Sequence, residues 1–191
     1  IARQFWREPH TDKQIRGSNL MEIRQAGIED LITLQTLGRE TYRHYFGSLW
    51  HNSDELEAFL AQDFGDEEML GSLDDPGHCW LMAVEKGVVA GFAKLHFDQP
   101  LDQAEGRGAK LCKLYFTPDS RSRGLGSQLF AAAEAAARAH RQPVLWLDVL
   151  QSNLPAIGFY QRQGMHQVTE NTYVTATQTT RLWIMKKEIN D

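Results

Sequence analysis

The chain has 191 residues, of which 42% are apolar and 24% are charged, and these values fit one globular domain with a sizeable core. The formal charge of −5 argues against a nucleic-acid-binding surface, which usually carries a basic surplus. The longest apolar run, residues 129–139, is interrupted by Glu134 and Arg138, so no membrane-spanning helix is predicted.

The predicted elements begin after an atypical N-terminus. Residues 1–20 are polar and mixed without clear periodicity, and Met21 opens the first regular pattern. We expect residues 1–20 to be an extension, either a natural arm or non-native sequence, and residues 21–191 to form the domain.

The rest of the chain alternates between strand and helix patterns. In chain order these predict a strand at 20–26, helices at 28–37, 39–46 and 55–64, a turn at 74–77, a hairpin of strands 79–85 and 88–97, a strand at 109–116, a helix at 127–140, a strand at 144–149, a helix from about 153 to 164, and strands at 166–173 and 179–188. The hairpin requires antiparallel strands, whereas the strand–helix–strand unit from 109 to 149 requires a parallel pair. The fold class is therefore α/β with a mixed sheet.

The cysteines and histidines indicate no metal site. Cys79 and Cys112 have neither metal-ligand spacing nor the number of a disulfide framework, and the seven histidines are scattered. Cys112 lies in a predicted central strand, where a buried, reduced thiol is expected. Reduced thiols fit a cytoplasmic protein.

A turn rich in arginine and glycine follows the strand at 109–116. It reads Arg121-Ser122-Arg123-Gly124-Leu125-Gly126 and leads into the helix at 127–140. Glycines let a phosphate approach the backbone, and a helix N-terminus offers free N–H groups and favours negative charge. The turn therefore predicts a phosphate site, and a plain β-to-α turn with solvent-facing arginines is the alternative that remains open.

A dinucleotide-binding turn is excluded. Asp148 lies at the end of the next predicted strand, where a ribose-binding acid would stand, but the motif G-x-G-x-x-G needs glycine or alanine at position 129, which is Leu129. The chain also lacks the second set of strands and helices that such a fold needs.

Asn153 and Tyr160 form the second notable pair. Their spacing corresponds to two helical turns, so they point from one face of the predicted helix. A phenol can donate a proton and an amide can bind a polar cofactor. A core aromatic residue with an N-cap is the structural alternative.

Both motifs together resemble the GNAT superfamily of acyl-CoA-dependent N-acyltransferases. The pattern R-x-x-G-x-G after a strand and the downstream segment N-L-P-A-I-G-F-Y-Q-R-Q-G-M occur in the order and spacing of that family, and the element order agrees from Met21 to Glu188. A looser similarity points to bacterial PaiA-type spermidine/spermine acetyltransferases. It is carried by Glu40-Thr41-Tyr42, Tyr45-Phe46, residues 59–64 and Met185-Lys186-Lys187-Glu188.

The resemblance implies a single-domain GNAT fold, in which a mixed sheet of about seven strands has helices on both faces and splayed central strands. Acetyl-CoA would be the co-substrate. Its pyrophosphate would bind at Arg121, Ser122, Arg123, Gly124, Leu125, Gly126 and Ser127, and its pantetheine would lie against Leu114, Tyr115 and Phe116 and near Asn153. Tyr160 would be the general acid that protonates the departing thiolate, and the N–H of Tyr115 or Phe116 could hold the oxyanion.

The acceptor implied by the resemblance is a primary amine, with a polyamine as the first candidate and a peptide or protein amine as the second. A homodimer is compatible with the family, and neither nucleic acid nor membrane is an expected partner. Tyr42, Tyr45, Phe46, Leu49 and Trp50 either pack in the core or form a wall of the acceptor pocket.

The general base is not identified by the sequence. Many family members carry a glutamate on the strand before the turn, but residues 109–116 contain no carboxylate. Glu40, His96 and Asp98 are the candidates elsewhere in the chain. The missing carboxylate leaves a second class of function open, a non-catalytic CoA-binding regulatory protein.

Overall fold

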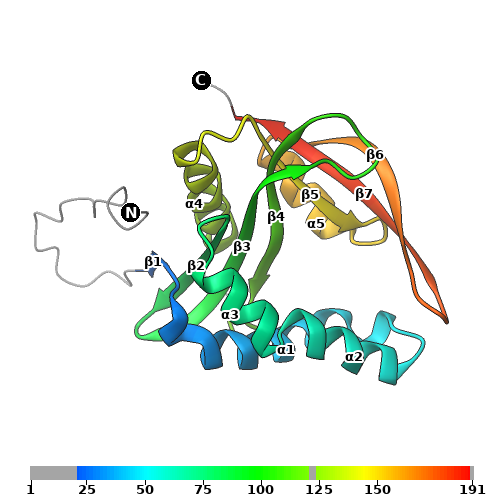
Figure 1. Ribbon diagram of the computed structural model, residues 1–191, viewed down its shortest axis with the longest axis horizontal. Helices are drawn as coiled ribbons and strands as arrows, with labels where there is room; N and C mark the ends of the chain where they lie inside the picture. Colours follow the sequence, from blue (N-terminus) through cyan, green and yellow to red (C-terminus); the bar gives the residue numbers. More distant parts are fainter. Residues whose placement is uncertain (1–20, 121–123, 190–191) are drawn as a thin grey trace, which may run out of the picture.

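The computed structural model describes residues 21–120 and 124–189. They form one seven-stranded mixed sheet in the order β1-β2-β3-β4-β5-β7-β6, with helices on both faces (Figure 1). The strands are β1 (Met21–Gln25), β2 (His78–Glu85), β3 (Val88–Pro100), β4 (Arg107–Phe116), β5 (Val144–Leu150), β6 (His166–Val174) and β7 (Thr179–Glu188). The predicted extension at residues 1–20 lies outside the described residues.

The five α-helices of the described residues divide between the two faces of the sheet (Figure 1). One face is covered by α1 (Leu31–Phe46), α2 (Ser53–Asp63) and α3 (Asp66–Asp74), whose apolar side chains pack with Trp80, Met82 and Phe92. The other face is covered by α4 (Leu125–Ala139) and α5 (Leu154–Arg162), which share a core with Leu81, Leu95 and Leu145. The α/β architecture predicted from the sequence is confirmed.

Two local predictions are confirmed by backbone geometry. Lys86 and Gly87 both have positive φ, 52° and 78°, which is the geometry of a two-residue hairpin turn between β2 and β3. Gly164 has a φ of 92° just after α5, so it ends that helix in a left-handed conformation.

The predicted break between helices at 28–37 and 39–46 is wrong, because α1 is continuous across Gly38. A Cβ at Gly38 would lie 2.2 Å from Cε1 of Phe64, so the glycine makes room for that ring. The short helix α3 is not predicted from the sequence, since its segment is acidic and only Met69 and Ser72 are buried. The strands β3 and β4 also extend further than predicted and shorten the loop between them to 101–106.

Candidate active site

The sheet opens between its two central parallel strands. β4 pairs with β5 at only two positions, Ala109 with Leu145 and Lys110 with Trp146. On its other side, β4 stays paired with β3 as far as Phe116. Within these fully described strands, the last residues of β4 therefore have no ladder partner on the β5 side. This confirms the predicted splaying, and the free edge can accept an extended chain as an added strand.

β4 contains an irregularity beside this opening. Lys94 of β3 pairs with Lys113, but the next residue, Leu95, pairs with Leu111, so Cys112 is an extra residue in β4. Such a bulge bends the strand and increases its twist. The bulge follows closely after the last β4–β5 pair, so both features contribute to the opening.

The turn after β4 ends at the N-terminus of α4. Gly124 is the N-cap residue, with a φ of 82° that favours glycine. No side chain caps this end of α4 and its first turn carries no acidic residue, so the described part of the helix N-terminus presents N–H groups and positive potential to an anion. Arg121, Ser122 and Arg123, which the sequence assigns to the phosphate site, lie outside the described residues.

The other predicted residues of this turn have packing roles. Leu125 is buried. A Cβ on Gly126 would lie 3.0 Å from Cε2 of Phe159, so this glycine brings α4 close to α5. The hydroxyl of Ser127 accepts a hydrogen bond from Nε2 of Gln163 at 3.0 Å. These contacts fix the position of the α4 N-terminus relative to α5.

Asn153 is the N-cap of α5, and its Oδ1 accepts a hydrogen bond from the N–H of Ala156 at 3.3 Å. Oδ1 of Asn153 therefore has the N-cap role that the sequence left open as the structural alternative. The side-chain amide nitrogen has no hydrogen-bond partner among the described residues, so it remains available to a ligand.

Tyr160 packs against the rings of Phe130 and Phe159, with centroid distances of 6.3 and 5.4 Å. Burial raises the pKa of its phenol well above the ordinary range, and the negative charge of Asp148 raises it further. A phenol with a raised pKa keeps its proton at neutral pH. Tyr160 can therefore act as a proton donor near the opening.

The three sequence-predicted residues at the end of β4 divide between the two faces. Leu114 and Phe116 pack with the core beneath α4 and α5, whereas Tyr115 packs with the core beneath α1, α2 and α3. Burial raises the pKa of Tyr115 well above its ordinary range, and the nearby Asp63 carboxylate contributes. The main-chain groups of Leu114 and Phe116 face the open edge, whereas those of Tyr115 face β3, because the N–H of Thr117 donates to Ala90 of β3 and backbone groups alternate along the strand.

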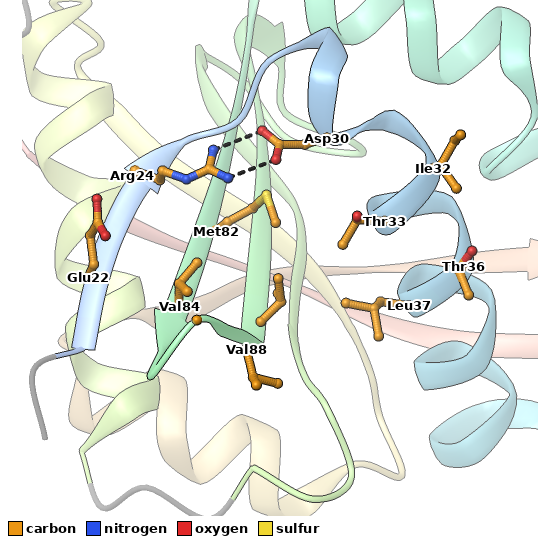
Figure 2. Close-up of a pocket in the computed structure, with 12 residues that line it drawn as sticks. Glu22, Arg24, Asp30, Ile32, Thr33, Thr36, Leu37, Met82, Val84 and Val88 are labelled. Carbon is orange, nitrogen blue, oxygen red and sulfur yellow. Dashed lines mark hydrogen bonds and ion pairs between the residues drawn. The ribbon is translucent and has the colours of Figure 1, made fainter.

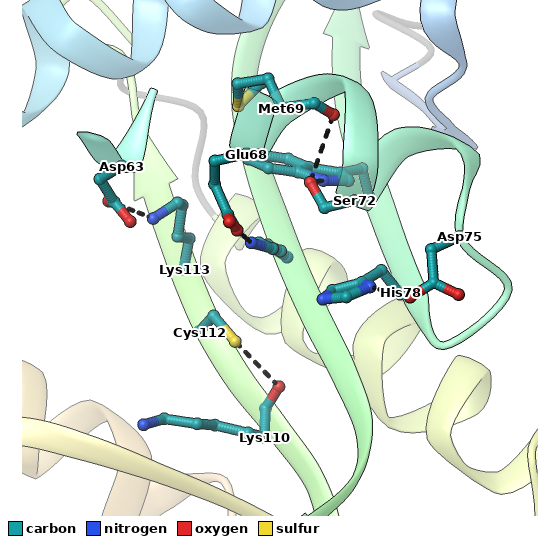
Figure 3. A network of polar contacts seen from close by, with 11 residues as sticks. Asp63, Glu68, Met69, Ser72, Asp75, His78, Lys110, Cys112 and Lys113 are labelled. Atoms are coloured by element: carbon teal, nitrogen blue, oxygen red, sulfur yellow. Dashed lines mark hydrogen bonds and ion pairs between the residues drawn. The ribbon is translucent and has the colours of Figure 1, made fainter. Parts of the chain in front are cut away.

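β4 carries two lysines in the region where the sequence lacks a carboxylate, and each has an acidic partner. Lys113 is buried and pairs with Asp63 of α2 (Figure 3). Lys110 pairs with Asp148 of β5 at 2.9 Å and with Asp102 at 3.4 Å. On β3, the buried Lys94 pairs with Glu68 at 2.6 Å. Sequence reasoning missed Asp63 and Asp148 as site residues, because their partners are distant along the chain.

The three candidate bases named from the sequence lie elsewhere. Asp98 pairs with Arg107 at the end of β4 that is remote from the opening. The ring of His96 stacks on that of His78 at 3.9 Å, and burial lowers its pKa, with the neighbouring His78 adding to the effect. Glu40 is exposed on α1.

An aromatic cluster lines the α1–α2 side of the opening. Tyr42 and Phe46 of α1 contact Tyr115 with centroid distances of 6.5 and 5.9 Å. Trp50 donates a hydrogen bond from Nε1 to the hydroxyl of Tyr42 at 3.3 Å. Burial raises the pKa of Tyr42 to about 12. Of the five residues predicted in this region, Tyr45 and Leu49 are exposed.

The β6–β7 hairpin closes this cluster on the far side. Tyr173 contacts Trp50 and Phe59, with centroid distances of 6.2 and 6.5 Å. Glu55 of α2 accepts hydrogen bonds from the hydroxyls of Thr175 and Thr177, both at 2.7 Å. Side chains from α1, α2, β4 and the hairpin thus meet at one aromatic wall.

A separate groove of about 630 Å³ lies between α1, β1 and the β2–β3 turn (Figure 2). Arg24 and Asp30 form a two-bond ion pair in it, with distances of 2.8 and 2.7 Å. This groove is on the β1 side of the sheet and is remote from the β4–β5 opening.

Neither a metal centre nor a membrane span is found in the described part of the chain. In residues 21–120 and 124–189 no three His, Cys, Asp or Glu side chains are grouped to hold a metal ion. None of the helices in these two ranges is long and apolar enough to cross a bilayer.

Comparison with known proteins identifies the family. Residues 38–165 match the model of the acetyltransferase (GNAT) family, which is well over half of the chain. The protein therefore belongs to the GNAT family and is an acyltransferase that uses acetyl-CoA as co-substrate. The resemblance inferred from the two sequence motifs is confirmed.

Individual relatives agree with this assignment. An uncharacterized N-acetyltransferase in the pepI 3′ region of Lactobacillus delbrueckii subsp. lactis is 28% identical over 170 residues, covering 88% of this chain and 98% of the relative. A spermidine N(1)-acetyltransferase from Thermoplasma acidophilum is 23% identical over 148 residues, with coverages of 75% and 87%. The crystal structure of PaiA N-acetyltransferase from the same organism, in complex with coenzyme A, has a TM-score of 0.69 at 22% identity, covering 88% and 99% of the two chains.

Proposed function

We propose that the protein transfers the acetyl group of acetyl-CoA to a primary amine, and that a polyamine is the first candidate for this acceptor. The observation that carries the proposal is the open edge of β4, which runs toward the N-terminus of α4 and whose Leu114 and Phe116 share a core with Tyr160. An amine can attack the thioester directly there.

The residues present fit coenzyme A. The α4 N-terminus and the turn at 121–127 supply an anion site for the pyrophosphate. In this proposal the edge of β4 at Leu114, Tyr115 and Phe116 lies against the pantetheine, and the side-chain amide nitrogen of Asn153 is available to bind it. In this proposal Tyr160, which is protonated at neutral pH, gives its proton to the thiolate of the departing coenzyme A.

Carboxylates near the opening suit a cationic acceptor. Asp63 and Asp148 lie beside Lys113 and Lys110 of β4, and both carboxylates are partly exposed. The similarity to a spermidine acetyltransferase makes a polyamine the first candidate, ahead of a peptide amine.

The test is release of the coenzyme A thiol from acetyl-CoA, measured with a thiol reagent in the presence of spermidine, a simple alkylamine and a lysine-containing peptide. We expect spermidine to accelerate thiol release most. If calorimetry shows that acetyl-CoA binds but none of these amines accelerates release, the proposed acceptor class is wrong and the non-catalytic alternative gains support.

A further inference from the structure

Asp148 lies at the apex of the opening between β4 and β5. The last paired residue of β5 is Trp146, which is opposite Lys110, and β5 continues without a β4 partner from there. Residues 146 and 148 point to the same face of the sheet, because side chains alternate along a strand. Asp148 therefore stands across the gap from Cys112, the extra residue of β4, and is close enough for its charge to act on that thiol.

The reactive end of the co-substrate is expected at this apex. In the proposed function its pyrophosphate lies beyond Phe116, at the N-terminus of α4, and its extended arm runs along the free edge of β4. An arm that enters there reaches the point where β4 and β5 meet. The thioester would then lie beside Cys112 and Asp148.

The surroundings of Asp148 suit a group that handles protons. Its side chain is 36% exposed, so water can reach it, and Lys110 contacts only Oδ2, at 2.9 Å. Among the described residues no hydrogen-bond partner is found for Oδ1. Tyr160 of α5 and Tyr115 of β4 are close enough for the charge of Asp148 to raise the pKa of both phenols.

Lys110 holds this carboxylate in place. Burial has the largest effect and disfavours the charge of Lys110, but the charge of Asp148, the hydrogen bond to it and the charge of Asp102 together raise the pKa of the lysine, so the ammonium persists. Lys110 also lies over the ring of Trp146, with Nζ 4.7 Å from the ring centroid. Asp148 thus stabilises the charge of Lys110, and Lys110 in turn fixes Oδ2 of Asp148.

We propose that Asp148 is the general base of the reaction, which binds the acceptor ammonium group and removes its first proton directly or through one water. This inference rests on the proposed function, and it places on β5 the carboxylate that is missing from β4. Lys110 is a positioning residue, with Asp102 as its second, more distant partner.

The proton balance is complete. The acceptor enters with three protons on nitrogen and leaves as an amide with one. Asp148 takes the first and releases it to solvent. The nitrogen then forms its bond to the acyl carbon while the carbon–sulfur bond breaks. Tyr160 gives its proton to sulfur, and the second proton from nitrogen restores the phenol.

The experiment compares Asp148→Asn with Asp102→Asn, a matched variant that removes a carboxylate from the same lysine. Rates of thiol release are measured with an alkylamine, whose pKa is about 10, and with a weakly basic amine of similar size that is uncharged at neutral pH. We expect Asp148→Asn to lower kcat/KM for the alkylamine by about 100- to 1,000-fold and to change it less than about threefold for the weakly basic amine, since that amine needs no base. Asp102→Asn should stay close to wild type.

Binding gives a second readout. Calorimetry should show unchanged affinity for coenzyme A in Asp148→Asn, together with weaker binding of the alkylammonium ion to the coenzyme A complex. Asp148→Glu should recover part of the lost rate. An equal loss with both amines, or an unchanged rate and pH profile in Asp148→Asn, would overturn the role of Asp148 while leaving the acetyltransferase function intact. Absence of turnover with every amine in the wild-type protein would overturn both proposals.

Discussion

The buried ion pair between Lys113 and Asp63 gives the sharpest test of how the site is held together. The side chain of Lys113 is 5% exposed and lies over the ring of Phe64, with Nζ 4.8 Å from its centroid. Asp63 is 28% exposed. In Asp63→Asn the ammonium group of Lys113 loses its counter-charge but stays buried. An uncompensated buried charge strongly destabilises the folded state.

The magnitude follows from the burial of the two partners. Removing one member of a fully buried pair costs about 3–5 kcal/mol. Asp63 keeps some contact with water and asparagine still accepts a hydrogen bond, so we expect Asp63→Asn to lower the free energy of unfolding by about 2 kcal/mol. Urea denaturation followed by circular dichroism measures this value.

Two further variants separate charge from shape. Glu57→Gln breaks the ion pair of Arg43 and Glu57, whose side chains are 44% and 56% exposed, and should leave the midpoint of unfolding near that of wild type. The double variant Asp63→Leu with Lys113→Met removes both charges and should recover most of the lost stability. If Asp63→Asn unfolds at the same urea concentration as Glu57→Gln, Lys113 does not depend on its buried counter-charge and the reasoning is refuted.

Four other predictions concern single residues. Gly124→Val should lower the unfolding free energy by about 1–2 kcal/mol, because φ is 82° there, and calorimetry should show weaker coenzyme A binding; unchanged affinity would remove the turn from the phosphate site. Tyr160→Phe should lower kcat about 100-fold with unchanged KM for acetyl-CoA, and an unchanged single-turnover rate would exclude the phenol as acid. The hydrogen bond from Arg24 lowers the pKa of Asp30 below 3.8, so the ion pair stabilises the fold fully above that pH and loses this contribution as the pH falls through the lowered value. The free energy of unfolding of Asp30→Asn should therefore decrease less steeply below about pH 4 than that of the wild type, and an identical pH profile would contradict this. Burial raises the pKa of Cys79 to about 12, so a thiol reagent should modify it only in urea, and rapid labelling of the native protein at Cys79 would argue otherwise.

The parts of the site that depend on neighbours along the chain could be predicted from the sequence. The turn with Gly124, the cap at Asn153 and the hairpin at Lys86 and Gly87 each follow from local backbone chemistry, and all lie where expected. The predicted break at Gly38 is wrong because this glycine serves the ring of Phe64, which comes only after the following helix, and no local pattern reveals that contact.

The carboxylates near the opening were missed for the same reason. Asp63 is the last residue of α2 and Asp148 lies on β5, so both are far along the chain from Lys113 and Lys110 of β4. Their proximity depends on how α2 and β5 pack beside β4. A search for a glutamate within β4 therefore could not find them, although the lysines on that strand indicate that acidic partners are needed from other elements.

The β6–β7 hairpin has a consequence for how acceptor preference can change. The far tip of the hairpin is held to α2 by hydroxyl–carboxylate hydrogen bonds from Thr175 and Thr177 to Glu55, whereas α1 and α2 are anchored through buried leucines and Phe64. Altering the hairpin tip thus disturbs few buried contacts. Substitutions or length changes at residues 173–178 could reshape one side of the aromatic wall while the sheet, the open edge of β4 and the α4 N-terminus stay as they are. Variants selected to accept new amines should therefore lose the least stability when their changes lie in this tip.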